Sequence, residues 1–174
     1  MPSTPNQTPH DGRHDFDFLQ GHWRVDNQRL RQRLQGSHDW ETFTAFQTNQ
    51  ALPGGIGNFD DFVANSWRPD YLGMSLRLFN PQTGLWSIYW LDNLSGGLTP
   101  AGILQPPVVG RFENGVGIFE GEDTLDGRPI LVRYRWSDLT PDSARWEQAM
   151  SDDAGNHWEV NWRMLMHRLD HRPQ

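Results

Sequence analysis

The chain contains no cysteine, which excludes disulfide bonds, thiolate catalysis and metal sites built on cysteine. It also lacks a run of basic residues, and its net charge is -7. A nucleic-acid backbone or an anionic membrane surface attracts clustered positive charge, so neither is an expected partner. The seven histidines are dispersed along the chain, and their spacing predicts no metal site. No cofactor is expected, and haem with one histidine as axial ligand is kept as an alternative.

Long hydrophobic runs are missing as well. No apolar stretch approaches the length that a membrane-spanning helix needs. The first ten residues have neither the basic start nor the apolar core of a signal peptide, so a cytoplasmic location is expected. Residues 1–14 are rich in proline, serine, threonine and histidine and are predicted to form a disordered tail, ahead of a single domain over residues 15–170.

Aromatic residues, in contrast, are abundant. The chain of 174 residues is 36% hydrophobic with a mean hydropathy of -0.74, yet it contains nine tryptophans, nine phenylalanines and three tyrosines. Burial must then be concentrated in a few large rings. Such a composition favours a small aromatic-lined barrel or sandwich over a leucine-rich helical bundle.

Four tight-turn signals divide the second half of the chain. They are Asn80 to Gly84, Asn114-Gly115, Asp126-Gly127 and Asp152 to Asn156, and each joins two runs that carry tryptophan or valine. Turns of this kind between such runs predict an antiparallel meander. Because side chains along a strand alternate between two faces, each turn also predicts which residues share a face.

The first of these turns predicts a hairpin with two unlike faces. If Phe79 lies opposite Leu85, one face is wholly apolar and the other is mostly polar. The apolar face pairs Leu78 with Trp86, Leu76 with Ile88 and Met74 with Trp90, and the polar face pairs Arg77 with Ser87 and Ser75 with Tyr89. The apolar face is then expected to pack on a hydrophobic core, and the polar face to meet water or a polar cavity.

The next two turns predict that aromatic rings lie beside glycine backbone. Gly117 is expected opposite Trp136, on the same face as the expected pair of Phe119 with Tyr134. Glycine beside aromatic rings is a feature of strongly curved sheets. The other face of these strands carries charge. It pairs Glu120 with Arg133 and also includes Arg111 and Arg135. Two interpretations of this face stay open: an outer barrel wall with cross-strand ion pairs, or an interior whose arginines receive a carboxylate ligand.

The last turn matches the Asp-box pattern S-x-D-x-G-x-x-W from Ser151 to Trp158, in which serine and aspartate bind turn amides and the tryptophan anchors the turn in the core. Asp-boxes repeat in sialidase propellers, but one copy in a short chain predicts only a hairpin. After the turn, alternation predicts a core face and a polar face. The core face has Trp158, Val160, Trp162, Met164 and Met166, and the polar face has His157, Glu159, Asn161, Arg163 and His167.

Two carboxylates are candidates for chemistry. Glu147 lies between Trp146 and Gln148, and Glu159 lies two residues before Asn161. In a closed cavity, burial raises the pKa of a carboxyl group towards the range useful for general acid–base catalysis. The alternative is that both carboxylates pair with arginines on the barrel wall, since structural ion pairs outnumber catalytic ones.

Several stretches together resemble a calycin-type, lipocalin-like family of bacterial proteins. They are Asp15 to Val25, Leu76 to Pro81, Trp86 to Trp90, Gly110 to Asp123 and Trp146 to Trp162, and the opening Phe18 to Trp23 is also similar to the start of nitrobindin barrels. The resemblance implies an all-β, up-and-down antiparallel β-barrel of eight to ten strands, with a short N-terminal helical turn, around a cavity that holds one small ligand. Nitrobindin-like proteins bind haem through a histidine near the C-terminus, a part that His157 or His167 would play here.

Four hypotheses about function follow. The first is binding of a small hydrophobic or aromatic molecule in the barrel cavity, with ligand-binding residues Arg77, Tyr89, Trp90, Arg111, Trp146 and Gln148. The second is a cofactor-independent lyase, isomerase or cyclase, with catalytic residues Glu147, Arg133, Glu159 and Asn161. The third is haem binding, and the fourth is a structural or interaction module with a filled interior. A homodimer is compatible with a tryptophan-rich barrel wall.

Overall fold

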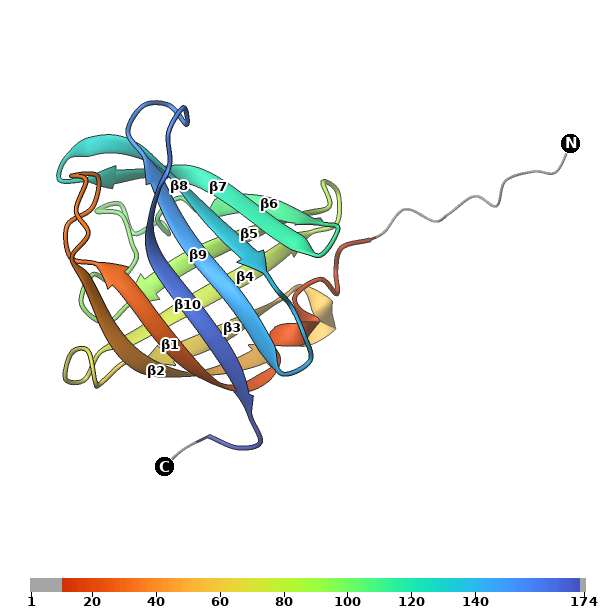
Figure 1. Cartoon of the computed structure of the whole chain (residues 1–174). Coiled ribbons are helices and arrows are strands. Elements are labelled where there is room, and N and C mark those ends of the chain that lie inside the picture. Colours follow the sequence, from red (N-terminus) through yellow and green to blue (C-terminus); the bar gives the residue numbers. More distant parts are fainter. Residues whose placement is uncertain (1–10, 173–174) are drawn as a thin grey trace, which may run out of the picture.

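The computed structural model describes residues 11–172 and forms a closed barrel of ten antiparallel strands (Figure 1). Every strand pairs with its neighbours in chain order, and the first strand closes the barrel against the last. The strands are β1 (Gly21–Leu30), β2 (Trp40–Ala51), β3 (Gly57–Val63), β4 (Leu72–Asn80), β5 (Leu85–Asp92), β6 (Val108–Glu113), β7 (Val116–Leu125), β8 (Arg128–Ser137), β9 (Ser143–Ser151) and β10 (Glu159–Leu169). The predicted all-β, up-and-down barrel is confirmed.

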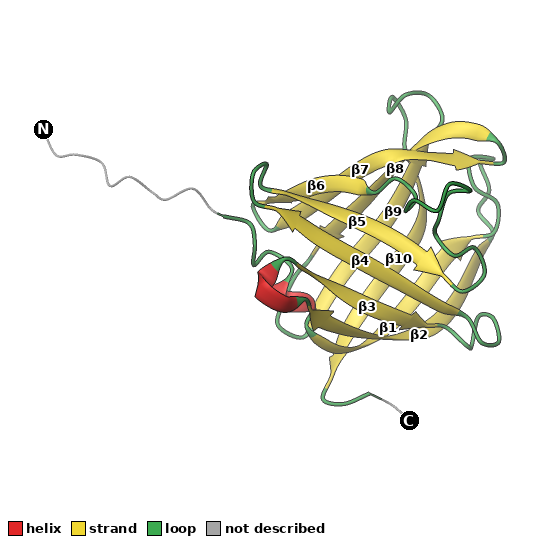
Figure 2. Ribbon diagram, turned by 180° about the vertical axis from the view of Figure 1, so that it is seen from behind, coloured by secondary structure: helices red, strands yellow, loops and turns green. Residues whose placement is uncertain are grey.

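Helical structure in residues 11–172 is limited to two short 3-10 helices, η1 (Asp17–Leu19) and η2 (Pro53–Gly55), which lie at one end of the barrel (Figure 2). The predicted N-terminal helical turn corresponds to η1.

Within residues 11–172, no helix combines the length and the apolar character that crossing a membrane requires. Most of the predicted disordered tail, residues 1–10 of 1–14, lies outside the described part of the chain.

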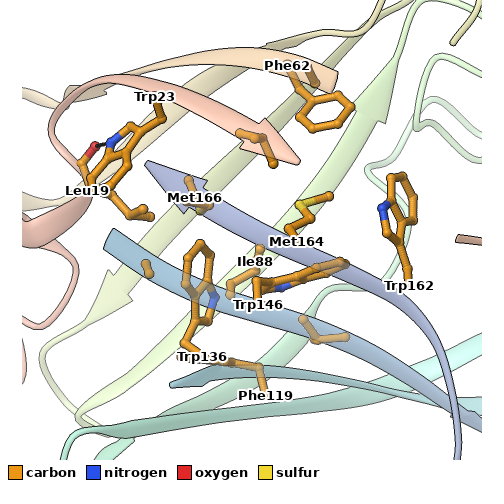
Figure 3. Packing of buried hydrophobic residues seen from close by; sticks show 14 of the residues in the cluster. Leu19, Trp23, Phe62, Ile88, Phe119, Trp136, Trp146, Trp162, Met164 and Met166 are labelled. Carbon is orange, nitrogen blue, oxygen red and sulfur yellow. Dashed lines mark hydrogen bonds between the residues drawn. The ribbon is translucent and has the colours of Figure 1, made fainter. Parts of the chain in front are cut away.

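The segment that leads into β1 closes the base of the barrel. Phe16 is 1% exposed, and its ring centroid lies 5.0 Å from that of Trp86 and 5.0 Å from that of Phe112. The buried Trp23 donates a hydrogen bond from Nε1 to the carbonyl oxygen of Leu19 at 2.7 Å (Figure 3). The barrel is therefore plugged at the η1 end by apolar packing that starts before the first strand.

Arg168 fastens this plug to the last strand. Its guanidinium group donates hydrogen bonds of 2.6 Å to the carbonyl oxygens of Phe18 and Gln20, and another of 2.6 Å to that of Pro141. The same group lies 4.2 Å from the ring centroid of Trp23. One arginine thus satisfies three carbonyl groups that lie outside the strands at the base of the barrel.

The register of the central strands is as the two-residue turns predict. Gly117 pairs with Trp136, and Phe119 pairs with Tyr134. A Cβ atom at Gly117 would lie only 2.7 Å from the ring of Phe112 and 2.8 Å from that of Phe119. Rings therefore lie over bare backbone on the inner face, which confirms the expected glycine–aromatic arrangement in a curved sheet.

The register of the β4–β5 hairpin differs from the prediction by one residue. Asn80, rather than Phe79, lies opposite Leu85, because the carbonyl oxygen of Asn80 accepts the turn-closing hydrogen bond from the Gly84 amide at 2.8 Å. A slip of one residue exchanges the two faces of a strand. The inner face of β4 therefore carries Ser75, Arg77 and Phe79, and the leucines expected in the core, Leu76 and Leu78, lie on the outer face with Met74.

The predicted alternation along β10 is broken by a β-bulge. Val160 lies opposite Ala149 and Trp162 opposite Gln148, so Asn161 is an extra residue without a partner in register. Asn161 is fully buried beside Trp162, instead of lying on the polar face. Trp158 is correspondingly not in the core: it lies half-buried on the outer wall, where the guanidinium of Arg133 is 3.8 Å from its ring centroid.

Candidate functional site: a funnel-shaped barrel cavity

The end of the barrel opposite η1 is open and leads into a funnel-shaped cavity. Its outer part has a volume of about 930 Å³ and is bordered by loops between the strands. It narrows to an inner chamber of about 70 Å³. Five residues line both parts and so form the neck: Ile88, Trp90, Tyr134, Gln148 and Trp162. The outer volume lies within the range of small-molecule sites in proteins.

Tryptophan forms much of the neck wall. The ring centroid of Trp162 lies 5.9 Å from that of Trp146 and 6.5 Å from that of Trp90. Figure 3 shows Trp162 at the opposite edge of the cluster from Trp23 and Leu19, with Trp146 and Met164 between them in this view. The Trp162 ring is held by a hydrogen bond from Nε1 to Asn27 Oδ1 at 2.9 Å. The neck is therefore a rigid aromatic surface suited to contact with a flat apolar ligand.

A buried ion pair lines the inner chamber. The side chains of Arg77 and Asp60 are 4% and 1% exposed, and Arg77 Nη1 donates to Asp60 Oδ2. Neighbouring groups complete this pair. Asn58 Oδ1 accepts from Arg77 at 3.1 Å, and Asp60 Oδ1 accepts from the Ser75 amide at 3.1 Å. The Nε atom of Arg77, however, is buried without a hydrogen-bond partner among the described residues.

Two further polar groups near the inner chamber can donate a hydrogen bond to a ligand: the side-chain amide of Asn161 and the hydroxyl of Tyr134. Gln148 Nε2 donates to Asn161 Oδ1 at 2.8 Å, but the amide nitrogen Nδ2 of Asn161 is buried without a partner in residues 11–172. The Tyr134 side chain lines both parts of the cavity. Burial raises the pKa of Tyr134, the charge of Asp123 raises it further, and Arg77 partly opposes the shift. Tyr134 therefore keeps its proton and can donate a hydrogen bond to a ligand.

The opening carries arginines beside aromatic rings. Arg29, Arg33, Trp67, Arg68 and Tyr71 line the outer part of the funnel along one side. The guanidinium of Arg68 lies 4.2 Å from the Trp67 ring centroid, and that of Arg29 lies 5.1 Å from it. Burial raises the pKa of Tyr71 to about 12, with the Asp92 charge adding to the effect. This tyrosine is likewise a neutral hydrogen-bonding group at neutral pH.

The structure brings half of the sequence-predicted site residues together. Arg77, Trp90, Trp146 and Gln148 all line the inner chamber, and Asn161 is hydrogen-bonded to one of them. Cavity residues that the sequence reasoning did not select are Asp60, Tyr134 and Trp162, together with Arg29, Trp67 and Arg68 at the opening. For Trp162 the alternation along the strand predicts a core position and no contact with a ligand.

The other predicted site residues lie outside the cavity. Arg111 pairs with Glu113 at 2.8 Å on the exposed wall, and Arg133 pairs with Glu120 at 2.6 Å. The outer-wall interpretation of that charged face is therefore the one the structure supports, and its arginines do not receive a ligand in the interior. Tyr89 lies opposite Leu76 on the outer side of the β4–β5 hairpin.

Neither candidate acid lines the cavity. Glu147 lies on the outer wall within 4 Å of three arginines, which are Arg135, Arg145 and Arg163. Glu159 Oε1 accepts a hydrogen bond from the Leu34 amide at 2.7 Å and so fastens the β1–β2 loop. Glu147 thus has the arginine-paired role that the sequence left as the alternative, whereas Glu159 is bound to a backbone amide and to no arginine among the described residues. Of the four predicted catalytic residues, only Asn161 is close to the cavity.

The residues present do not fit a haem held by the predicted ligands. His157 is 91% exposed and bonds to Asp153 in the last turn, and His167 is half-exposed on the outer wall, 3.9 Å from Asp26. No histidine lines either part of the cavity. Between residues 11 and 172, no three histidine or acidic side chains are placed to share a metal ion.

Fold and cavity together define a closed β-barrel protein with a ligand-sized, aromatic-lined interior. No family model matches the chain, and no curated protein matches it. Among solved structures, it is similar to Rv2717c from M. tuberculosis, with a TM-score of 0.55 and 13% sequence identity over 93% of this chain and 98% of that one. At this identity the likeness shows the barrel fold alone, so membership of the calycin-type family stays a prediction.

Proposed function

We propose that this protein binds one small, largely aromatic molecule in the funnel of the barrel. The observation that carries the proposal is the neck, where Trp90 and Trp162 border a space that continues into the open funnel, with Trp146 in the inner chamber next to them. Protein interiors are normally packed without large voids. A funnel of about 930 Å³ that leads to an aromatic neck is therefore a feature to explain by a ligand rather than by folding.

The polar groups at the deep end support the same proposal. Arg77 Nε and Asn161 Nδ2 are buried donors without partners among residues 11–172, and each such group destabilises the fold unless something pairs with it. The Tyr134 hydroxyl is a third donor in the same region. We infer that the ligand places one polar acceptor, such as a carbonyl or hydroxyl oxygen, towards the inner chamber and an aromatic face against the neck.

A titration with a neutral aromatic dye tests the proposal. N-phenyl-1-naphthylamine becomes fluorescent in apolar sites and accepts excitation energy from nearby tryptophan, so binding in the neck predicts saturable, one-to-one energy transfer. A larger side chain in the funnel should weaken dye binding and so reduce this energy transfer. Val132, which is 4% exposed and lines the funnel, supplies the blocking variant Val132→Phe.

The matched control is Val109→Phe, because Val109 is 38% exposed on the outer wall. The proposal predicts that Val132→Phe weakens binding at least about tenfold, which corresponds to about 1.4 kcal/mol, and that Val109→Phe leaves it unchanged. Thermal unfolding of both variants checks that the barrel is intact. Equal binding by wild type and Val132→Phe would contradict a site in the funnel.

A further inference from the structure

We propose that the ligand carries one anionic group, a carboxylate, sulfonate or phosphate, that binds to the arginines at the opening of the funnel. The inference rests on the proposed function and specifies the chemical class of the ligand. Its basis is a cluster formed by Arg29, Arg33 and Arg68, which we call the rim arginines. All three line the outer funnel beside the aromatic wall.

The rim arginines come together because β1, β2 and β3 pair in chain order. Arg29 is on the inner face of β1 near its end, Arg33 follows in the β1–β2 loop, and Arg68 is in the loop between β3 and β4. Positive charge is thus gathered at one edge of a cavity in a protein whose net charge is -7. Like charges at close range disfavour one another unless an anion lies between them.

Negative charge from the chain itself compensates this cluster only in part. Glu41 lies 3.3 Å from Arg29, but it also binds Arg31 at 3.0 Å on the outer side. Arg33 and Arg68 have no ion pair with any residue between 11 and 172, and Arg29 Nε is buried without a hydrogen-bond partner. Burial lowers the pKa of Arg29, and repulsion from Arg33 adds to that shift. The cluster therefore has unused donors and uncompensated charge.

Four acidic residues, Asp92, Glu122, Asp123 and Asp152, also line the outer funnel, and three of them have a hydrogen-bond or ion-pair partner within the described residues. Asp92 accepts hydrogen bonds from the amides of Leu94 and Ser95, at 2.9 and 2.7 Å, within its own loop. Asp152 lies 3.9 Å from Arg128. The rim arginines come from β1 and from the loops after β1 and β3, whereas Glu122 and Asp123 are on β7, so the funnel has a positive and a negative side and an anionic ligand has a single preferred orientation.

Aromatic rings connect the rim arginines to the neck. The guanidinium of Arg29 lies 5.1 Å from the Trp67 ring centroid and 5.3 Å from that of Trp162, and Trp162 lines both parts of the cavity. An anion bound at Arg29 would therefore sit next to the surface that the aromatic body contacts. Arginine suits this role because its planar group can stack on a ring and still donate to an oxyanion.

Two dyes that share one aromatic skeleton test the inference. 1-Anilinonaphthalene-8-sulfonate and N-phenyl-1-naphthylamine differ only by the sulfonate group. If the rim arginines bind an anion, wild-type protein should bind the sulfonate dye about tenfold more tightly, and salt should weaken only that dye. The double variant Arg33→Gln/Arg68→Gln should remove most of this preference, so that the affinities for the two dyes come within about twofold of each other.

Arg111→Gln is the matched control, because Arg111 belongs to an exposed ion pair with Glu113 on the outer wall. It should leave both affinities unchanged, and circular dichroism confirms that each variant is folded. Equal affinity for the two dyes in wild-type protein, or a sulfonate preference that survives the double variant, would overturn the inference and leave the proposed function standing. Failure of both dyes to bind would contradict the proposed function itself.

Discussion

Arg77 and Asp60 form an ion pair in the interior of the barrel, on neighbouring strands β4 and β3, with side chains that are 4% and 1% exposed. Removing two charges from water is expensive, and only good hydrogen bonding compensates for it. Asn58 and Ser75 supply that hydrogen bonding. The pair therefore contributes to a polar floor beneath the aromatic neck.

Breaking this pair on one side should destabilise the barrel strongly. Arg77→Met leaves the Asp60 carboxylate buried and unpaired, and we expect a loss of about 3–5 kcal/mol in the free energy of unfolding. The double variant Asp60→Leu/Arg77→Met should recover most of that loss, since no charge is left buried. Urea unfolding of the wild type and the variants measures both effects. A single variant that costs less than about 1 kcal/mol would show that the pair is not desolvated as described.

Tyr134 and Tyr89 form a matched pair of tests for the inner surface. The Tyr134 hydroxyl is the donor that we place at the neck, so Tyr134→Phe should weaken binding of a ligand with an oxygen acceptor by about two- to tenfold. Tyr89 lies on the outer side of the β4–β5 hairpin, and Tyr89→Phe should have no effect on binding. Isothermal titration with aromatic ketones or phenols makes the comparison. Equal effects of the two changes would remove Tyr134 from the site.

Glu147 offers a test of the acid–base hypothesis. Because this carboxylate contacts three outer-wall arginines, Glu147→Gln should lower stability by about 1–3 kcal/mol and leave ligand affinity within about twofold of wild type. Chemical denaturation and dye titration on the same samples separate the two quantities. A variant that is stable but no longer binds ligand would return Glu147 to the site.

The last turn predicts a specific dependence on pH. The amide of His157 and the hydroxyl of Ser151 donate to the Asp153 carboxylate, and the hydrogen bonds from His157 are the main reason that its pKa is lowered from 3.8 to about 2. A group whose pKa is lower in the folded chain stabilises the fold above its unfolded pKa, and the stabilisation is lost as pH falls towards the folded value. The turn should therefore weaken between about pH 4 and pH 2.

Asp153→Asn is the control for this effect, because asparagine keeps an acceptor oxygen but does not titrate. The difference in unfolding temperature between wild type and Asp153→Asn should be constant above about pH 5 and should shrink as the pH falls below 4. Thermal unfolding across this range measures it. A difference that stays constant down to pH 2 would mean that the carboxylate does not stabilise the turn.

Turn motifs in the sequence predicted the strand pairing correctly where the turn allows only one register of the two strands it joins. Asn114-Gly115 and Asp126-Gly127 allow a single two-residue turn each, and the pairing of Phe119 with Tyr134 followed from them. The five residues from Asn80 to Gly84 allow the turn to be closed by either Phe79 or Asn80. The choice decides which side chains of β4 point into the barrel and which point outward. Sequence reasoning therefore selected Arg77 as a ligand residue and yet placed the leucines beside it in the core.

The rest of the site depends on contacts between distant parts of the chain. Asp60 becomes a partner of Arg77 only when β3 pairs with β4 across the loop of residues 64–71. The bulge at Asn161 has no marker in the local sequence, and without it the residue falls on the outer face. The rim arginines come from three separate segments. Periodicity and turn patterns do not contain this information, because they describe neighbours along the chain.

Native mass spectrometry of the protein purified without denaturation tests the central claim most directly, with wild type and Val132→Phe prepared side by side and incubated with the same aromatic ligand. The account predicts one small molecule bound to each wild-type chain and none to the variant, with both proteins folded. The same bound mass on both chains, or no bound mass on either with any aromatic ligand of this class, would contradict a binding site in the barrel funnel.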